Sequence, residues 1–390
     1  MTSRSDAATL DAADPLRRLR DEFLTPDPDV VYLDGNSLGM PPRRTAERLA
    51  SLVTGEWGTG LIGSWGTWLD MPQRVGDRLA PLIGARPGEV VVHDSTTVNL
   101  YQLVHAGLRL RPDRSVIAIG EGEFPTDRYV VDGIAASAKS ATGRSLIVRH
   151  GFDRLDDVAV AVRSVVDYRS AEVVDIVAET ARAREAGALM LWDLSHAAGV
   201  LVVDLHAAGA ELAVGCTYKF LNGGPGAPAW SYVATALHAS VEQPIWGWFG
   251  QVEQFAMGPT FEPRPDIGRL LLGTPSILAL AAAEEGIGLS AEAGIEQIAL
   301  KASALTQFAI EVCDDLGLVT TTPRDPLRRG GHVNVHHPDA RHLVPALAER
   351  KVITDFREPD VIRFGLSPLS TSYADVDRGV SVLRELLLAP

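Results

Sequence analysis

One lysine of this chain stands between an apolar segment and a glycine-rich turn, in the run Cys216-Thr-Tyr-Lys-Phe-Leu-Asn-Gly-Gly-Pro-Gly226. Upstream of Lys219, Asp193 ends another apolar segment in the run Trp192-Asp-Leu-Ser-His196. An amine in such a place can bind an aldehyde covalently, and a carboxylate can keep a ring nitrogen protonated. Together the two side chains could hold a carbonyl cofactor and make its ring an electron sink.

Each half of this pair also has an ordinary explanation. A lysine before glycines is usually a solvated loop residue, and an aspartate at a strand end is usually a helix cap. Their order, in a chain whose strand and helix patterns alternate, favours catalysis. The pair therefore indicates a pyridoxal phosphate (PLP) enzyme.

Eight short runs, taken in chain order, resemble those of the kynureninase family. The Asn36 turn, the Phe124 run and the Lys219 turn are the most specific to that family, whereas the Asp193 and Lys219 pattern recurs across the class V aminotransferase superfamily. The runs cover nearly the whole chain: Tyr32-Leu-Asp-Gly-Asn-Ser-Leu-Gly39, Asp94-Ser-Thr-Thr-Val-Asn-Leu100, Phe124-Pro-Thr-Asp127, Val166-Asp-Tyr-Arg-Ser170, Trp192-Asp-Leu-Ser-His196, Gly247-Trp-Phe-Gly250, Gly273-Thr-Pro-Ser-Ile-Leu278 and Asp360-Val-Ile-Arg-Phe-Gly365.

The resemblance implies a fold-type-I PLP enzyme that hydrolyses the Cβ–Cγ bond of L-kynurenine or 3-hydroxy-L-kynurenine. The products would be anthranilate or 3-hydroxyanthranilate, and L-alanine. Lys219 would move the Cα proton, Asp193 would pair with the ring nitrogen, and Tyr218 could relay a proton to the product. A homodimer with shared active sites is also implied. The resemblance leaves open whether the enzyme acts in tryptophan catabolism or in a kynurenine pathway that leads to NAD biosynthesis.

The cofactor's phosphate needs its own donors. Thr96 and Thr97 precede an apolar helical run, so they offer hydroxyl groups and free N–H groups at a helix N-terminus, although an ordinary cap has the same pattern. The resemblance places both threonines at the phosphate and adds Tyr218, Trp248 and Thr274. It takes Trp248 and Thr274 from the neighbouring subunit, while a buried core position is the alternative for the indole.

The resemblance assigns four further residues to the cofactor. Phe124 would stack on its ring, and Asp127 belongs to the same contact group. His196 follows Asp193 closely and would approach the ring or the aspartate, and Ser164 matches a hydroxyl residue that contacts the cofactor. Loop packing for the phenylalanine and a structural role for the histidine are the plainer alternatives.

A carboxylate-bearing substrate needs a cation, and Arg363 is the candidate because a guanidinium pairs bidentately with a carboxylate. A surface salt bridge is the commoner fate of such an arginine. By resemblance, Asn36 and Ser37 would lie near the substrate, and Trp65 would line the pocket for its aromatic ring.

Three positions depart from the family pattern where substrate choice is made. Gly66 stands where kynureninases usually have asparagine, and both Val165 and Gln251 stand where they usually have histidine. These departures leave the Lys219 and Asp193 chemistry intact. They leave open which ring substituent is preferred.

Apolar periodicity predicts the elements that position these residues. Short β-rich runs alternate with helical stretches such as 173–186, which favours an α/β fold with a mostly parallel sheet covered by helices. After Gly273, a long helical region (277–316), strands at 332–336 and 361–364, and helices at 340–351 and 374–388 predict a smaller C-terminal α+β domain. The early strands are expected at 116–119, 158–162, 188–192 and 229–233.

We expect an N-terminal segment at 1–40 that packs on the rest, a large cofactor-binding domain at 41–275 and a small domain at 276–390. The net charge of −14 argues against nucleic acid or an anionic membrane as the main partner. The first residues lack the apolar stretch of a signal peptide, so a cytoplasmic protein without membrane contact is expected. Two cysteines cannot make a disulfide framework.

Two other patterns, a glycine-rich run and a strand that carries histidines, do not indicate a different kind of site. Gly223-Gly-Pro-Gly226 lacks the spacing of a dinucleotide-binding loop, and His332, Asn334 and His336 lack the acidic or cysteine partners that a metal site needs, so no metal is expected. The competing functions are another class V activity, such as aminotransfer or β-elimination, and a PLP-binding protein without catalysis. Lys219, Asp193 and Arg363 together argue against the second, since a binding module does not need all three.

Overall fold

The computed structural model describes residues 5–25, 27–142 and 145–388. Its larger part is built on a seven-stranded sheet in the order β2-β8-β7-β6-β5-β3-β4. Neighbouring strands are parallel except at β8, which is antiparallel to both β2 and β7. The strands are β2 (Val90–His93), β3 (Val116–Ile119), β4 (Ile147–His150), β5 (Val158–Ser164), β6 (Leu189–Asp193), β7 (Leu212–Gly215) and β8 (Ala229–Val233).

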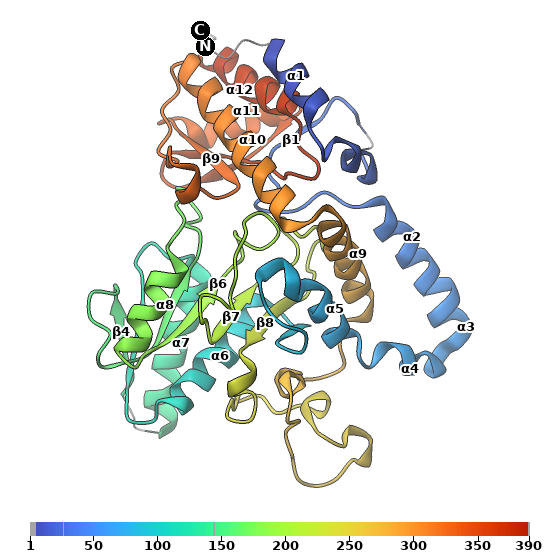
Figure 1. The fold of residues 1–390 in the computed structure, drawn as a ribbon, viewed down its shortest axis with the longest axis vertical. Coiled ribbons are helices and arrows are strands. Elements are labelled where there is room, and N and C mark those ends of the chain that lie inside the picture. The colour runs from blue at the N-terminus through green and yellow to red at the C-terminus, as the bar shows by residue number, and fades with distance from the viewer. Residues whose placement is uncertain (1–4, 26, 143–144, 389–390) are drawn as a thin grey trace.

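Alternation along these strands sends apolar side chains to both faces of the sheet. Val90 and Val92 join one buried cluster, and Val91 joins the other. Helices cover both faces, as Figure 1 shows, and so bury the sheet on each side. The first cluster includes α5 (Met71–Leu79), α8 (Ile176–Glu185) and α9 (Ile277–Ala293), and the second includes α6 (Thr96–Leu110) and α7 (Pro125–Thr142).

A second body carries both termini (Figure 1). Its antiparallel sheet has the order β11-β12-β9, and its helices share a buried cluster with β9 and β12. The N-terminal helix α1 (Ser5–Ala13) packs on α12, and β1 (Val31–Tyr32) pairs with β10 (Val352–Ile353). The other elements are α10 (Ile295–Asp315), β9 (His332–His336), α11 (Ala340–Glu349), β11 (Asp355–Arg357), β12 (Val361–Gly365) and α12 (Tyr373–Leu388).

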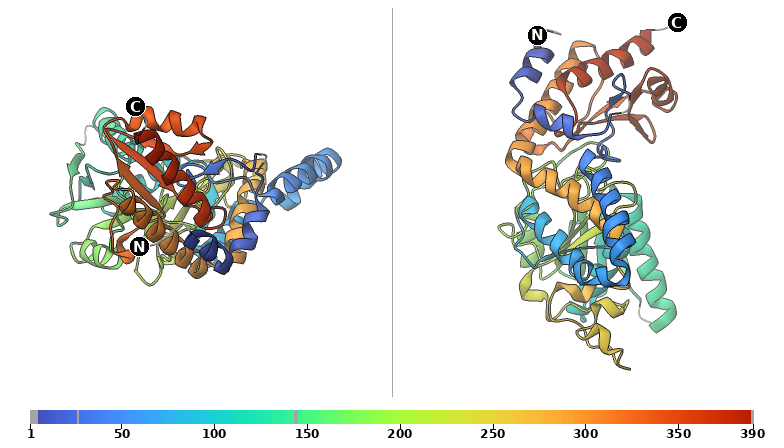
Figure 2. Two further views of the ribbon diagram at one scale, coloured as in Figure 1. Left: turned by 90° about the horizontal axis from the view of Figure 1, so that it is seen from above. Right: turned by 90° about the vertical axis from the view of Figure 1, so that its right-hand side faces the viewer.

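Two segments project from the larger part of the molecule, which is built on the seven-stranded sheet. One contains α2 (Arg43–Ser51), a π-helical turn (Leu52–Trp57), α3 (Gly58–Gly60) and α4 (Trp65–Trp68), and it extends clear of the body in Figure 2. The other, around residues 245–265, lies at the end of the molecule away from the termini (Figure 1). No helix within the described ranges has the length and apolar character to cross a membrane.

The prediction of an α/β fold with a mostly parallel sheet is confirmed. The helical region expected at 277–316 is two helices, because Gly294, at φ 80°, ends α9 and precedes α10. Strands β2, β4 and β7 were not predicted. Each has only four residues and ends in His93, His150 or Gly215, so its apolar run is shorter than that of the equally short but wholly apolar β3.

Candidate active site

The carboxyl ends of β2, β3, β5, β6 and β7 meet at one edge of the large sheet, where ligands of open α/β folds usually bind. The residues expected to hold the cofactor leave the sheet at this edge. The runs concerned are Asp94–Thr97, Glu123–Asp127, Asp193–His196 and Cys216–Lys219, with Ser164 at the end of β5. Ser164 pairs in register with Asp193 of the neighbouring strand.

Lys219 places a buried amine at this edge. The residue is 8% exposed, and its Nζ lies 3.4 Å from both ring nitrogens of His196. The Phe124 and Tyr218 rings each lie 5.8 Å from Nζ. Within the described ranges no carboxylate forms an ion pair with Lys219. The amine is therefore not tied to an acidic partner.

His196 is held in its neutral form. Burial, and then the charge of Lys219, lower the pKa of His196 well below its ordinary value. The ring of His332 lies 6.0 Å away, and burial followed by Arg363 lowers the pKa of that histidine to about 3. Both imidazoles therefore leave the positive charge of the site to lysine and arginine.

Asp193 presents a fixed carboxylate. Its Oδ1 accepts hydrogen bonds from the Ser195 N–H at 2.8 Å and the Ser195 hydroxyl at 2.6 Å. Burial, and then the charge of Asp193, raise the pKa of Asp127 well above its ordinary value. Burial likewise raises the pKa of Glu123 to about 7. The neighbours of Asp193 therefore favour their protonated forms.

The first turn of α6 offers donors for an anion. Ser95 caps the helix, its hydroxyl accepting from the Val98 N–H at 3.4 Å. Thr96 and Thr97 open the helix, where backbone N–H groups lack intrahelical acceptors and the helix dipole favours negative charge. The Asp94 carbonyl accepts from Ala229 at 3.1 Å, which fixes the loop before the cap.

These groups fit PLP. Among the described residues, Asp127 Oδ2 is buried without a hydrogen-bond partner, as expected of a group that awaits a ligand. One sheet edge carries a buried amine for the aldehyde, an aspartate held by Ser195 for the ring nitrogen, aromatic rings beside the amine and a helix N-terminus for the phosphate.

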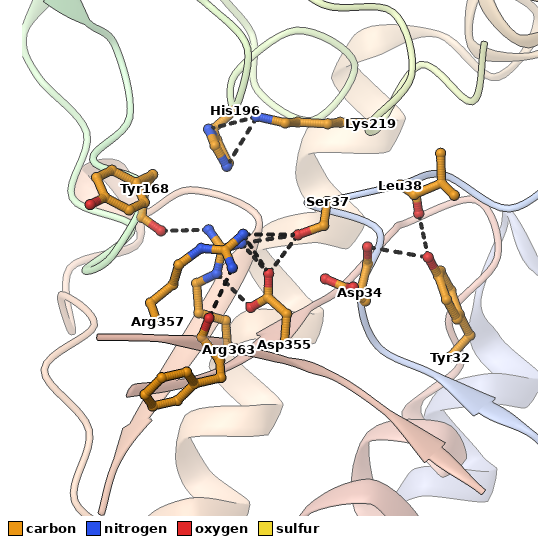
Figure 3. A network of polar contacts seen from close by, with 11 residues as sticks. Tyr32, Asp34, Ser37, Leu38, Tyr168, His196, Lys219, Asp355, Arg357 and Arg363 are labelled. Carbon is orange, nitrogen blue, oxygen red and sulfur yellow. Dashed lines mark hydrogen bonds and ion pairs between the residues drawn. The ribbon is translucent and has the colours of Figure 1, made fainter. Parts of the chain in front are cut away.

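Arg363 lies at the other side of the site, on the C-terminal sheet (Figure 3). It is 1% exposed, and its Nε donates to Asp355 Oδ1 at 2.7 Å. Its Nη1 donates to the Tyr168 carbonyl at 2.7 Å, and its Nη2 donates to Ser37 Oγ at 3.0 Å and to Asp355 Oδ2. In one of its two amide orientations, the Asn36 oxygen lies 3.2 Å from Nε.

The turn that carries Asn36 and Ser37 packs directly on the lysine turn. The Gly39 N–H donates to the Tyr218 carbonyl at 2.8 Å, and a Cβ at Gly39 would lie 2.3 Å from the Lys219 carbonyl oxygen. Only glycine permits this approach. The contact brings the N-terminal turn, the lysine turn and Arg363 into one site.

Three predicted site residues form a separate group. Trp65 lies near Phe249, with ring centroids 6.2 Å apart, and Trp248 packs on the same ring at 4.6 Å. Thr274 is exposed and lines, with Trp65, an apolar cavity of about 400 Å³. The chain thus gathers the lysine cluster in one place and this aromatic group in another.

The three residues that depart from the family pattern, Val165, Gln251 and Gly66, have different surroundings. Val165 is buried, and its N–H donates to the Asp193 carbonyl at 2.9 Å. Gln251 accepts from the Glu262 N–H and so braces its projecting loop. Gly66 has open space where a side chain would stand.

Sequence reasoning missed four polar residues of the site: Asp34, Glu123, Asp355 and Arg357. Glu123 directly precedes Phe124, and Asp34 lies inside the N-terminal run that resembles the family, so the sequence held a signal for both residues. Asp355 and Arg357 alternate along a three-residue strand, which is too short to reveal its face.

Comparisons with known proteins show what the chain as a whole is similar to. A family model described as the kynureninase C-terminal domain matches residues 298–383. A kynureninase of Pseudomonas fluorescens is 43% identical, and the alignment covers 99% of this chain and 96% of the relative. Among solved structures, a cysteine desulfurase of Thermococcus onnurineus NA1 superimposes with a TM-score of 0.79 at 17% identity, covering 99% of this chain and 98% of that one. A variant of C-DES with glycine covalently linked to its PLP cofactor also gives a TM-score of 0.79, at 15% identity over 93% of this chain and 98% of that one.

Proposed function

This chain belongs to the kynureninase family, and from that premise we propose how its residues perform the family's reaction. The protein is a PLP-dependent hydrolase that cleaves the Cβ–Cγ bond of L-kynurenine to give anthranilate and L-alanine. Bound PLP supplies an electron sink for the negative charge that develops on the substrate. At the level of residues, the observation that carries the proposal is the buried Lys219 amine, 3.4 Å from His196, at the same carboxyl edge of the sheet as Asp193.

Lys219 binds the cofactor and then acts as a base. Once the substrate's amine has replaced its own, the freed Nζ removes the proton from Cα. Its position supports this role, because no acidic partner among the described residues competes for the amine. Asp193, held by Ser195, keeps the ring nitrogen protonated.

Tyr218 supplies the proton that the product needs. Burial, and then Cys216 and Asp193, raise the pKa of Tyr218, so its hydroxyl remains protonated and can donate. Water adds to the Cγ carbonyl of the substrate, and cleavage of the Cβ–Cγ bond leaves a carbanion equivalent at Cβ. Protonation at Cβ from Tyr218, return of the proton from Lys219 to Cα and release of the product amine would together give L-alanine.

Arg363, with Asn36 and Ser37, holds the substrate's carboxylate and so orients Cα toward Lys219. With the cofactor bound, Phe124 would stack on its ring, Asp127, Ser164 and His196 would complete the ring contacts, and Thr96 and Thr97 would hold the phosphate. Support comes from the convergence of these side chains at one sheet edge and from the short path between Arg363 and Lys219 through the Gly39 turn.

The protein acts as a homodimer in which Trp248 and Thr274 reach the phosphate in a second copy. Their group stands apart from the lysine cluster within one chain, which supports a role across an interface. The projecting segments expose large apolar side chains that a second copy would cover. They include Trp57 (53% exposed), Ile62 (80%), Trp246 (65%) and Met257 (72%).

Product identification tests the reaction. The holoenzyme is incubated separately with L-kynurenine and with 3-hydroxy-L-kynurenine, in the presence and absence of pyruvate. We expect anthranilate or its 3-hydroxy form, with L-alanine in equal amount and no need for pyruvate. Products that appear only with pyruvate would instead identify an aminotransferase, and the ratio of the two rates gives the substrate preference.

Lys219→Ala tests the central residue. We expect no turnover, and we expect borohydride reduction of the PLP-loaded variant to leave no cofactor covalently attached, because the buried amine is gone. Mass spectrometry of the intact protein measures the attachment. Lys301→Ala provides the matched control, since Lys301 is also buried but pairs with Asp14 instead of facing the site. A cofactor adduct on the Lys219 variant would contradict the assignment.

A further inference from the structure

The C-terminal sheet presents a second guanidinium beside Arg363. Alternate residues of β11 point to one face, so Asp355 and Arg357 lie on the same side. The register pairs Asp355 with Arg363 of β12, which brings both arginines to the same carboxylate. Arg357 lies 2.8 Å from Asp355 Oδ2, and its Nη2 also donates to Ser37 Oγ at 3.4 Å (Figure 3).

The two arginines differ in what they have left to offer. Each of the three nitrogens of Arg363 already donates to Asp355, Ser37 or the Tyr168 carbonyl, and its side chain is 1% exposed. The side chain of Arg357 is 32% exposed; its Nη1 donates only to the neighbouring Phe356 carbonyl at 2.9 Å, and its Nε is buried. A new acceptor therefore meets a partly exposed guanidinium at Arg357 and an enclosed one at Arg363.

The charges leave room for one more anion. Two guanidinium groups face Asp355, and although burial opposes it, the hydrogen bonds from Arg363 hold the pKa of Asp355 below its ordinary value. Burial, and then the charge of Asp355, raise the pKa of Asp34 to about 7, so much of this carboxyl is uncharged at neutral pH. The nearby histidines are neutral. Where Asp34 is protonated, the arginine pair carries one uncompensated positive charge.

We propose that Arg357 is a specificity-determining residue that binds the substrate's α-carboxylate together with Arg363. The inference rests on the proposed function, because it assigns a second cation to the substrate end of that site. The hydrogen-bond partners of Arg363 fix its guanidinium, which therefore orients the substrate's carboxylate. Arg357 supplies a partly exposed guanidinium and the charge that Asp355 leaves unbalanced.

A purely structural role is the alternative. Arg357 would then serve only to hold Asp355 and Ser37 in place, and its loss would weaken every ligand of the site alike. If Arg357 instead recognises the carboxylate, only ligands that carry this group should bind more weakly to the variant. The two roles are therefore separated by comparing a carboxylate ligand with its uncharged amide.

The experiment uses the PLP-loaded enzyme with L-alanine and L-alaninamide as probes, and the absorbance of the bound cofactor reports their binding at one fixed pH. We expect Arg357→Gln to weaken L-alanine on the order of tenfold or more, the usual effect of losing a charge-assisted hydrogen bond, and to leave L-alaninamide within about twofold. Arg357→Lys should recover part of the loss because it restores the charge.

Arg341→Gln is the matched control. Arg341 stacks on Phe356, the residue between Asp355 and Arg357, but its side chain is 62% exposed and pairs with Glu358. This control should bind both probes as the unaltered enzyme does. Equal weakening of both probes by Arg357→Gln, or no weakening of either, overturns the proposal. Since the probes report binding without cleavage, failure of the enzyme to cleave kynurenine would refute the proposed function without mimicking either result.

Discussion

Three carboxyl groups lie at the carboxyl edge of the sheet that also carries Lys219, and their surroundings differ. Asp193 Oδ1 accepts two hydrogen bonds from Ser195. Asp127 lacks such compensation at Oδ2 and retains its proton. Glu123 is intermediate: its carboxylate accepts from the Ser164 N–H at 2.9 Å, yet burial still raises its pKa to about 7.

Glu123 gives the fold a pH dependence that substitution should remove. The folded protein holds this proton up to about pH 7, whereas the unfolded chain releases it near pH 4.5. The stabilisation is therefore complete below pH 4.5 and is lost as pH rises to 7, by about 3 kcal/mol at most. The change that Glu123→Gln makes in the free energy of unfolding, relative to the unaltered protein, should therefore be more favourable at pH 8 than at pH 5. Urea unfolding of the apoenzyme at both pH values measures the difference.

Glu121→Gln is the control for that measurement. Glu121 belongs to the same loop but is exposed, so its substitution should change stability equally at both pH values. A pH-independent effect of Glu123→Gln would mean that this carboxyl is already ionised in the folded protein. The apoenzyme is used because a bound cofactor would place a new charge beside Asp193.

At the scale of elements, two glycine-bearing turns meet to build the site. The approach of Gly39 to the Lys219 carbonyl leaves no room for a methyl group, since a Cβ would also lie 2.4 Å from Asn222 Oδ1. Gly39→Ala should therefore displace the lysine turn. We expect a loss of about 1–3 kcal/mol in the free energy of unfolding, in the range of other overpacked sites, together with a fall in kcat.

Gly133→Ala is the matched control. Gly133 lies within α7 and has open space at its Cβ position, so alanine should stabilise that helix by about 0.5–1 kcal/mol without changing kcat. Thermal unfolding and steady-state rates of both variants give the comparison. Normal kcat in a folded Gly39→Ala enzyme would show that the lysine turn tolerates displacement.

Sequence could predict the elements with strong local signals. The apolar runs of β3 and β8 and the helix α12 were expected within a residue of their bounds. The Asp193 and Lys219 cluster was also predictable, because each residue sits at the end of a recognisable segment. The division at Gly294 was not, because alanine and leucine continue on both sides of it.

The substrate end of the site depends on contacts that local sequence does not encode. Ser37 and Asp355 meet at 2.6 Å although 318 positions separate them. Their meeting requires the N-terminal run to cross from the pairing of β1 with β10 to the lysine turn. Family resemblance supplied Arg363, Asn36 and Ser37, but the charges that surround Arg363 became visible only with the fold.

At the scale of the whole molecule, a chain with a net charge of −14 must hold a phosphate dianion. The donors proposed for it within one chain are mostly neutral: the first turn of α6, the hydroxyl groups of Thr96 and Thr97, and Tyr218. Further donors from a second copy would strengthen this site. We propose that the aromatic group around Trp248, together with the exposed apolar segments beside it, makes that contribution across an interface.

Mixed dimers test this sharing directly. Lys219→Ala and Trp248→Ala should each inactivate a homodimer, the first by removing the amine and the second by removing a phosphate donor. If Trp248 serves the partner's cofactor, a mixed dimer places both lesions in one site and leaves the other intact. Activity should then recover, after subunit exchange, to about half the unaltered value per mixed dimer. Exchange is verified by native mass spectrometry, and the absence of recovery in verified mixed dimers would place Trp248 in its own chain's site or outside both.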